Sequence, residues 1–349
     1  MRKPVVGINT TKYGYHDSLY ISRMTFLAIS RLFMLSFFTF VFPLLVTPAL
    51  SAVVRIPLPP RVTGPESLAF EPTGTFYTGV TDGRILKFER SQGFLDFAII
   101  SPNRSKAVCD GVAEPQRLCG RPLGLGFYYL TKTLYVADAY YGLLSLGPRG
   151  RLATPIASSA DGQSFVFCEG LDVDQQTGFV YFTDASAVYD IRNVEQAVLA
   201  NDSTGRLLKY DPRTNQVTTL LRNLSGPGGV AVSKTGSFVL VSEFIANRTQ
   251  KFWLTGPRAN TAEVFVRHVR PDNIKRTLRG DFWIAAMMLK QPTQTLVPIR
   301  QLVSETGSVL RTVSLEAHYG NTSITEVLEF GVRLYFGSKL TNFIGVSTP

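Results

Sequence analysis

Residues 121–138 read RPLGLGFYYLTKTLYVAD, and this stretch decides the fold. It begins with a proline- and glycine-containing segment, passes through a short strand and a turn, and finishes with an aromatic and β-branched strand that ends at Asp138. Short apolar runs bounded by turn residues are typical of strands. Helical periodicity is nearly absent after residue 52, so we expect an all-β domain.

The same module recurs along the chain, about every 50 residues. Its six copies start at residues 64, 121, 168, 226, 271 and 323. A four-stranded blade cannot bury both of its faces alone, whereas six blades stacked around an axis can. We therefore predict a six-bladed β-propeller over residues 53–349. The first strand of each blade should line the central channel, so a ligand site is expected where these strands begin.

Residues 1–52 form the predicted leader. Leu32–Val46 is an uncharged apolar run that follows Arg23 and Arg31 and precedes the small residues around 49–52. A basic segment, a short apolar stretch and small residues describe a secretory signal, with cleavage near residue 51 or 52. An uncleaved signal anchor is the alternative, and Met24 is an alternative start that would leave a signal of ordinary length.

The charge balance excludes one class of partner. The net charge is +10, but residues 1–52 contribute +4 of it, and the remaining 297 residues carry +6 without a run of five basic residues. Nucleic acid is therefore not an expected partner. We expect a small-molecule metabolite, and a membrane only if the leader is retained. The sequence does not define the oligomeric state.

Two features agree with a secretory address. Five of the ten asparagines after residue 52 lie in Asn-x-Ser/Thr sites, which accept glycans in the secretory pathway. These sites are Asn103, Asn201, Asn223, Asn247 and Asn321. Cys109 and Cys119 flank a short loop and should pair in an oxidising compartment, which leaves Cys168 as a buried apolar thiol.

Standard catalytic signatures are missing. The sequence has no Gly-x-Ser-x-Gly elbow, no His-Glu-x-x-His, no P-loop and no dinucleotide fingerprint. After residue 52 only His268 and His318 could serve a Ser-His-Asp arrangement, and neither lies where an inner strand begins. We interpret both as surface or hydrogen-bonded core residues. No Cys/His cluster has zinc spacing.

Acidic and amide side chains stand where three of the modules begin. Glu66 opens the first module, Glu169 the third, and Asp272 with Asn273 the fifth. Oxygen ligands gathered on a propeller axis would suit Ca²⁺, which takes 6–8 of them. The fourth module offers only Gly228 at this place. The alternative is that these groups hydrogen-bond one another or water in the channel.

Several long motifs resemble those of plant strictosidine synthase-like proteins. The matching stretches are residues 119–127, 134–144, 180–186, 204–212, 256–257 and 273–276. The resemblance covers essentially all of residues 55–347. It implies a six-bladed propeller, a Cys109–Cys119 disulfide and a location in the vacuole, the endoplasmic reticulum or the apoplast.

The resemblance does not carry the family's named activity with it. Strictosidine synthase joins tryptamine to the aldehyde secologanin, and the matching strand places Thr325 where that enzyme has its proton-handling glutamate. Glu326 is the next residue and should face away from the channel, because side chains alternate along a strand. A threonine hydroxyl is a poor base near neutral pH. The pocket residues that this alignment implies, together with one apolar channel residue, are Leu123, Phe167, Glu169, Gly228, Ser323 and Thr325.

Calcium-dependent esterases and lactonases belong to the wider superfamily. Glu66, Asp272 and Asn273 match their metal pattern, whereas Glu169 and Gly228 depart from it. The leading hypothesis is a lumenal hydrolase of esters or lactones among small plant metabolites. A non-catalytic binding or structural glycoprotein of the cell wall or pollen coat is the second hypothesis. A true strictosidine synthase is the third.

Overall fold

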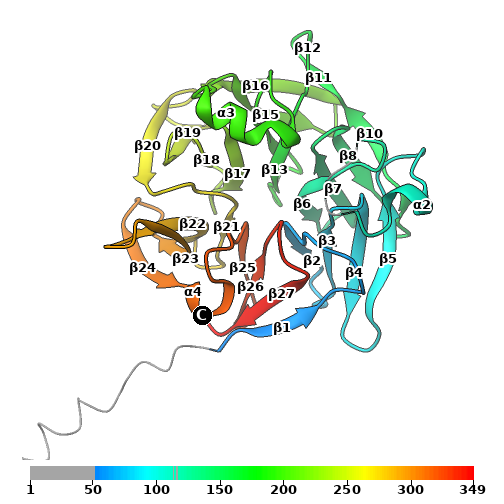
Figure 1. The fold of residues 1–349 in the computed structure, drawn as a ribbon. Helices are drawn as coiled ribbons and strands as arrows, with labels where there is room; N and C mark the ends of the chain where they lie inside the picture. Colours follow the sequence, from blue (N-terminus) through cyan, green and yellow to red (C-terminus); the bar gives the residue numbers. More distant parts are fainter. Residues whose placement is uncertain (1–51, 113, 115–116) are drawn as a thin grey trace, which may run out of the picture. The chain divides into compact units, whose positions relative to one another are not determined.

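The computed structural model describes residues 52–349 except 113, 115 and 116. The predicted leader, its cleavage site and the alternative start at Met24 lie outside the described residues, of which Ala52 is the first. Residues 53–349 form one compact unit, in which six sheets surround a central axis (Figure 1). No helix of the described part is long and apolar enough to span a bilayer.

Each blade contains four antiparallel strands that follow one another outward from the axis. The first three blades are β2 (Leu68–Phe70), β3 (Phe76–Gly79), β4 (Arg84–Glu89) and β5 (Gly93–Ile99); β6 (Pro122–Tyr128), β7 (Thr133–Asp138), β8 (Gly142–Leu146) and β10 (Thr154–Ala157); and β13 (Cys168–Val173), β14 (Val180–Asp184), β15 (Gly205–Asp211) and β16 (Gln216–Leu224). Blades 4 and 5 are β17 (Pro227–Val232), β18 (Phe238–Glu243), β19 (Arg248–Trp253) and β20 (Ala262–Arg267); and β21 (Ile274–Arg276), β22 (Phe282–Lys290), β23 (Thr295–Val303) and β24 (Val309–Ser314).

The two ends of the described chain close the ring in blade 6. Its inner three strands are β25 (Glu326–Phe330), β26 (Arg333–Gly337) and β27 (Phe343–Ser347), and its outermost strand is β1 (Val54–Pro57). The pairing of β1 with β27 joins the first strand to the last sheet and leaves no open blade. The predicted all-β six-bladed propeller is therefore confirmed.

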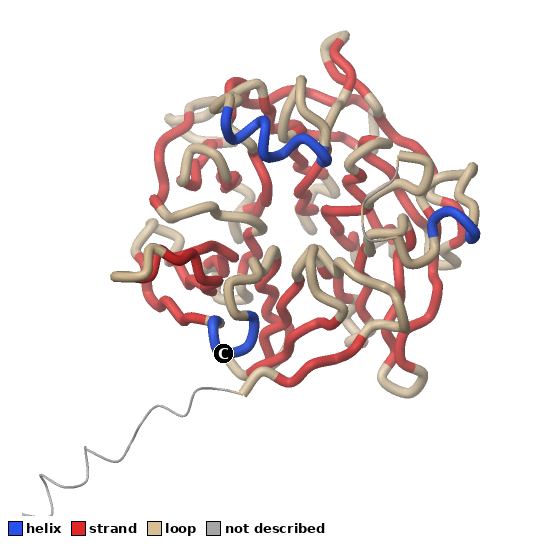
Figure 2. Tube along the Cα trace, in the orientation of Figure 1, coloured by secondary structure: helices blue, strands red, loops and turns tan. Residues whose placement is uncertain are grey.

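The remaining elements are short. Strand β9 (Arg151–Leu152) extends blade 1, and β11 (Ser159–Ala160) pairs with β12 (Gln163–Ser164) in a separate hairpin. The helices are α2 (Lys106–Cys109), η2 (Ile191–Asn193), α3 (Val194–Leu199) and α4 (Glu316–Tyr319). Figure 2 shows how little of the domain is helical, and Figure 1 shows α3 in front of blades 3 and 4.

The acidic residue that ends the sequence module lies at the end of the second strand of its blade, where it accepts hydrogen bonds from the backbone. Asp138 accepts a hydrogen bond from the backbone N–H of Arg121 at 2.7 Å, and Glu243 accepts one from that of Ser225 at 2.9 Å. Both carboxylates are buried, so these donors would otherwise be unpaired away from water. Each acidic residue thereby fixes the loop that leads into its own inner strand.

Glycines in the inner strands let these strands approach one another around the axis. A Cβ on Gly170 would lie 2.5 Å from the carbonyl oxygen of Gly228, and a Cβ on Gly229 would lie 2.4 Å from Cα of Asn273. Any larger residue would separate the backbones of blades 3, 4 and 5. The glycine-rich segment at the start of blade 4 therefore holds the channel narrow.

The cysteines and His268 follow the sequence predictions, whereas His318 does not: it is half-buried, and its Nε2 is buried without a hydrogen-bond partner in the described part of the chain. Cys109 and Cys119 form a disulfide with an S–S distance of 2.06 Å, and Cys168 is a free, buried thiol. His268 is a core residue whose two ring nitrogens hydrogen-bond Thr249 and Gln301. The asparagines of all five Asn-x-Ser/Thr sites are exposed.

Candidate functional site

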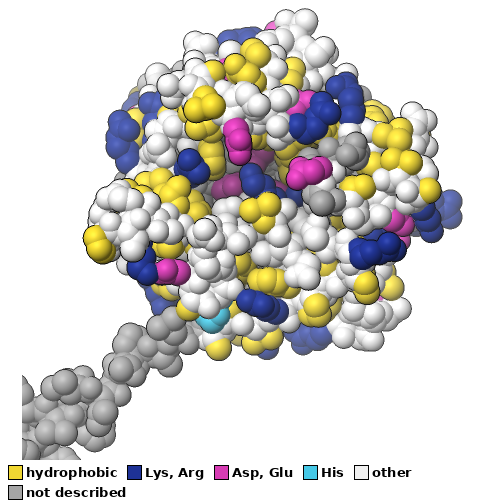
Figure 3. Space-filling view, viewed as in Figure 1, with side chains coloured by type: hydrophobic (Ala, Val, Ile, Leu, Met, Phe, Trp, Pro, Cys, Tyr) yellow, Lys and Arg dark blue, Asp and Glu magenta, His cyan; other side chains and the backbone are white. Residues whose placement is uncertain are grey.

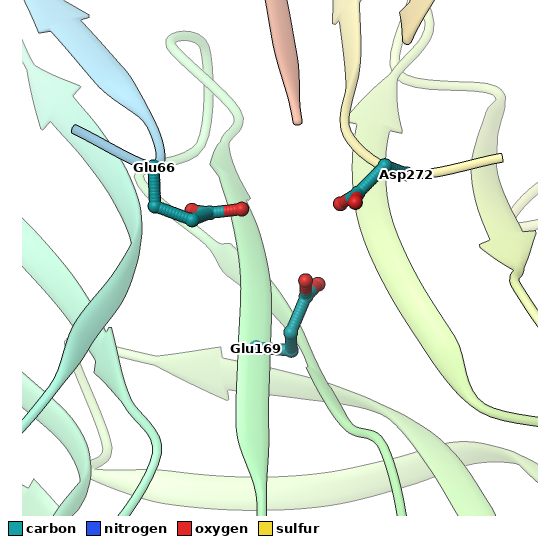
Figure 4. Close-up of side chains that lie close together, drawn as sticks. All are labelled: Glu66, Glu169 and Asp272. Carbon is teal, nitrogen blue, oxygen red and sulfur yellow. The ribbon is translucent and has the colours of Figure 1, made fainter. Parts of the chain in front are cut away.

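Three carboxylates meet on the propeller axis, and we call them the axial cluster. Glu66 precedes β2, Glu169 lies at the start of β13, and Asp272 precedes β21, so the cluster draws one residue from each of blades 1, 3 and 5. Their side chains point toward one another in Figure 4, and one oxygen from each lies within 4.8 Å of the others. The closed ring brings together residues that are far apart in the sequence.

Each member of the axial cluster has a buried oxygen without a hydrogen-bond partner in the described part of the chain. These atoms are Oε2 of Glu66, Oε2 of Glu169 and Oδ1 of Asp272. Burial raises the pKa of all three carboxyls, and repulsion from Asp272 raises the pKa of both glutamates further. The pKa of Asp272 rises to about 6. Such a group of hard oxygen atoms fits a divalent cation, which would relieve the repulsion.

Two further residues that the sequence placed at this site adjoin the cluster. The side-chain amide of Asn273 donates a hydrogen bond to Oε1 of Glu66 at 3.1 Å, which fixes that carboxylate. A Cβ on Gly228 would lie 3.1 Å from Oε2 of Glu169. The blade 4 position therefore faces the cluster but supplies no side-chain ligand.

Hydroxyl groups hold the backbone around the cluster, and sequence reasoning missed two of them. Ser242 donates to the carbonyl of Asp272 at 2.6 Å, and Thr183 donates to the carbonyl of Gly228 at 2.8 Å. Both residues directly precede the acidic residue that ends the second strand of a blade, and this position in the module is the sequence signal that could have identified them. Thr325 donates to the backbone carbonyl of Glu66 at 2.7 Å, so its hydroxyl joins blade 6 to blade 1.

A pocket opens beside Glu169 and Asp272 of the axial cluster. Glu169 and Asp272 line it together with apolar residues of blades 3 to 5 and of α3, and Figure 3 shows acidic and basic side chains in the central hollow. The apolar and aromatic lining includes Phe167, Tyr189, Val194, Ala197, Pro227, Phe244, Ile245 and Pro271. An acidic floor under apolar walls can bind a small molecule with an apolar body and a polar group.

The structure divides the pocket residues that the sequence predicted. Phe167, Glu169 and Gly228 line the pocket. The other three, which belong to blades 2 and 6, are not among its lining residues. They are Leu123, Ser323 and Thr325. Leu123 and Thr325 are buried, and the backbone carbonyl of Leu123 accepts a hydrogen bond from Ser67.

Lys339 is a pocket residue that sequence reasoning missed. It follows β26, is exposed and lines the pocket, and its positive charge lowers the pKa of Glu66, Glu169 and Asp272 against the stronger effect of burial. A single lysine in a loop carries no pattern that would place it here. It gives the mouth one positive charge beside three acidic groups.

The expectation that Glu326 faces away from the channel is wrong. Its buried carboxylate accepts a hydrogen bond from the backbone N–H of Leu68 at 3.4 Å and lies 3.6 Å from Nζ of Lys275, so it contacts both neighbouring blades. Its charge raises the pKa of both Glu66 and Glu169. Burial raises the pKa of Glu326 itself to about 7. Strand β25 begins at this residue, so the alternation of a regular strand does not fix its direction.

The metal-free protein is expected to lose stability as the pH rises. Burial raises the pKa of Glu66, Glu169 and Asp272 above the unfolded values of about 4, and repulsion from neighbouring carboxylates raises the pKa of the two glutamates further. Between the unfolded and the folded pKa values, the folded state therefore binds more protons than the unfolded state. The free energy of unfolding therefore falls as the pH rises through the folded pKa values. Thermal midpoints measured in chelator should show that Glu169→Gln is stabilised relative to the native chain near pH 8, with a smaller gap near pH 5. A gap that widens toward acid would contradict this.

The fold and the axial cluster define a class of protein, a six-bladed propeller with an acidic site at the mouth of its channel. A gluconolactonase from Xanthomonas campestris has this fold, with a TM-score of 0.63 at 12% identity over 86% of this chain and 90% of that one. Regucalcin from Agrobacterium tumefaciens, described as a calcium-binding protein, gives a TM-score of 0.58 at 14% identity over 85% and 93%. At these identities the likeness concerns the fold alone.

Sequence comparison identifies the family. Residues 169–257 match the family model for strictosidine synthase, and residues 47–88 match the model for the N-terminal part of strictosidine synthase-like proteins. Strictosidine synthase-like 11 from Arabidopsis thaliana is 44% identical over 301 residues, which are 85% of this chain and 91% of that protein. Strictosidine synthase from Catharanthus roseus is 38% identical over 290 residues, 81% and 82% of the two chains. The chain belongs to the strictosidine synthase-like family.

Proposed function

We propose that this protein is a calcium-assisted hydrolase of esters or lactones among small metabolites. The observation that carries the proposal is the axial cluster of three unpartnered carboxylate oxygens, because two of its members, Glu169 and Asp272, line an apolar pocket. Buried polar atoms without a partner are costly, so a site that retains three of them invites a ligand of opposite charge. The gluconolactonase-type propellers share the fold that presents the site.

Glu66, Glu169 and Asp272 would hold the ion, with the Glu66 carboxylate positioned by Asn273. When bound, Ca²⁺ supplies Lewis-acid polarisation of a carbonyl oxygen. The chain's own part is to orient the substrate and to exclude water. Phe167 and Phe244 in the pocket wall can take the apolar body of a substrate and leave its carbonyl group over Glu169 and Asp272.

The pocket that the described residues line lacks the proton-handling glutamate that strictosidine synthase uses to condense an amine with an aldehyde. The hydroxyl of Thr325 is buried, donates to the carbonyl of Glu66 and does not line the pocket. No histidine is among the pocket-lining residues of the described chain. Loss of a positioned general base typically lowers the rate by about 10²–10⁴-fold. We therefore expect no substantial formation of strictosidine from tryptamine and secologanin.

The test is turnover of purified protein on a panel of esters and lactones, with Ca²⁺ and with chelator. The proposal expects hydrolysis of at least one substrate that needs Ca²⁺ and returns when Ca²⁺ is restored. Absence of turnover across the panel would contradict it. The second candidate, a non-catalytic binding glycoprotein, is favoured by the lack of a histidine in the pocket lining. It would be supported by a small molecule that co-purifies unchanged.

We place the protein in the lumen of the secretory pathway, in the vacuole, the endoplasmic reticulum or the apoplast. Its disulfide and its five exposed glycan acceptor sites support this location. Protein expressed in plant cells should lose mass on treatment with an endoglycosidase. The proposal would be contradicted if the enzyme left the mass unchanged and the protein also retained its leader.

Replacing Lys339 by methionine is expected to tighten Ca²⁺ binding about two- to fivefold. The ammonium group interacts with all three carboxylates and would repel an ion held among them, although solvent screens this exposed charge. The dissociation constant should be measured by calorimetry at low and high salt. Lys132→Met, the same change at a distant exposed site, is the matched control and should have no effect. Weaker binding in Lys339→Met would show that the lysine supports the ion.

A further inference from the structure

Six turns ring the end of the channel opposite the pocket, and we call their surface the distal face. They connect each inner strand to the second strand of its blade. They span residues 71–75, 129–132, 174–179, 233–237, 277–281 and 331–332, and Arg333 follows the last of them as the first residue of β26. Because the inner strands begin at the pocket, these turns must lie at the other end. The turns of blades 2, 3 and 4 are in contact, since the N–H of Tyr129 donates to Gln175 at 3.1 Å and Gln176 donates to the carbonyl of Lys234 at 3.5 Å.

Large aliphatic side chains stand almost fully exposed on three of these turns. Leu130 of blade 2 is 80% exposed, Leu278 of blade 5 is 83% exposed, and Val332 of blade 6 is 80% exposed. The packing of the blades does not require them, because each lies outside the core. Several such side chains on one face of a domain indicate contact with an apolar phase or partner.

The exposed charges of the distal face all have one sign. Lys132, Lys234, Arg279 and Arg333 are exposed, and they belong to blades 2, 4, 5 and 6. None of the acidic side chains on these turns is exposed. Asp174, for example, is buried and accepts a hydrogen bond from the hydroxyl of Thr177 at 2.6 Å. Each exposed aliphatic side chain is thus followed within two residues by a cation.

We propose that the distal face docks on an anionic lipid bilayer. Leu130, Leu278 and Val332 enter the boundary between headgroups and acyl chains, while the four cations lie at the level of the lipid phosphates. The pocket then opens away from the membrane, toward the aqueous phase. This surface is independent of the proposed hydrolysis and needs no retained leader.

The charge pattern separates this face from the mouth of the pocket. The mouth also exposes aliphatic side chains, including Val188 and Leu199, but Arg192 there lies among the acidic residues Asp190 and Glu195. Mixed charges give no net attraction to anionic lipid. Leu199 is therefore a matched control for the aliphatic residues of the distal face.

The experiment is flotation of the purified chain, without residues 1–52, with vesicles of phosphatidylcholine containing about 30% phosphatidylserine. We expect binding at about 0.05 M salt, loss of binding at about 0.5 M salt, and no binding to pure phosphatidylcholine. A Leu130→Trp variant should shift its fluorescence to the blue with the anionic vesicles only. If the chain does not bind anionic vesicles at low salt, the proposal is overturned. The distal face would then be interpreted as a contact surface for a protein partner.

Paired variants test which residues act. Lys234→Ser with Arg279→Ser should weaken vesicle binding about 25-fold, because each cation near the surface contributes roughly fivefold. Leu130→Ser with Leu278→Ser should weaken it at least about tenfold, whereas Leu199→Ser should leave it unchanged. Circular dichroism and hydrolysis of a soluble substrate should be unaltered in all of them, which separates docking from folding and from the pocket. Equal losses in the Leu199 variant and the distal pair would contradict the assignment.

Discussion

Replacing Asp272 by asparagine is expected to lower kcat/KM on a cleaved ester or lactone at least about a hundredfold. Asp272 belongs to the axial cluster and also lines the pocket, so the change removes a charge that holds the ion next to the substrate. Asparagine keeps the shape of the side chain, and the hydrogen bond from Ser242 to the backbone carbonyl of residue 272 is retained. The measurement is kcat/KM across a series of Ca²⁺ concentrations.

The matched control for this variant is Asp161→Asn. Asp161 is an exposed carboxylate paired with Arg222, away from the pocket, and its loss should leave kcat/KM unchanged. High Ca²⁺ should recover part of the activity of Asp272→Asn if weakened ion binding is the cause. Full activity of Asp272→Asn at low Ca²⁺ would show that the axial cluster does not take part in the reaction.

Replacing Arg206 by methionine is expected to lower the free energy of unfolding by about 3–5 kcal/mol. Arg206 forms a buried ion pair with Asp184 at 2.6 Å, and both side chains are almost completely buried. Without the arginine, the carboxylate is left as an unpaired charge in the interior. Asp184 also accepts the backbone N–H of Phe167 at 3.0 Å, so the pocket wall should loosen at the same time. Denaturant unfolding measures the loss.

An exposed pair in the same chain provides the comparison. Arg222→Met breaks the surface pair with Asp161 and should cost no more than about 1 kcal/mol. Adding Asp184→Asn to Arg206→Met should restore part of the stability, because no buried charge then remains unpaired. A loss of similar size in the two arginine variants would refute a special role for the buried pair.

The sequence alone could predict the fold because its signal is repeated. Strand modules that end in acidic residues such as Asp138, Asp184 and Glu243 recur along the chain, and each of these three orders the loop before its own inner strand. Propeller topology then brings together the residues at the starts of alternate blades. The repeat and this topology together predict that Glu66, Glu169 and Asp272 lie near one axis.

The pocket was less predictable because it depends on loops and on local strand geometry. Lys339 and the residues of α3 reach the mouth through loop conformations that no periodic pattern specifies. Glu326 is the first residue of β25, so strand alternation does not predict the direction of its side chain. Thr325 was expected in the pocket, yet its hydroxyl joins two blades. Contacts of this kind arise when the ring closes and leave little trace in local sequence.

Calorimetric titration of the chelator-treated protein with Ca²⁺ tests the central claim most directly. One ion per chain should bind, and a hundredfold excess over Kd should stabilise the fold by about 2.7 kcal/mol. Glu169→Gln should bind far more weakly under the same conditions. If the native chain releases no heat of binding and its thermal midpoint stays fixed across millimolar Ca²⁺, then the three carboxylates do not form a metal site and the proposed chemistry fails with them.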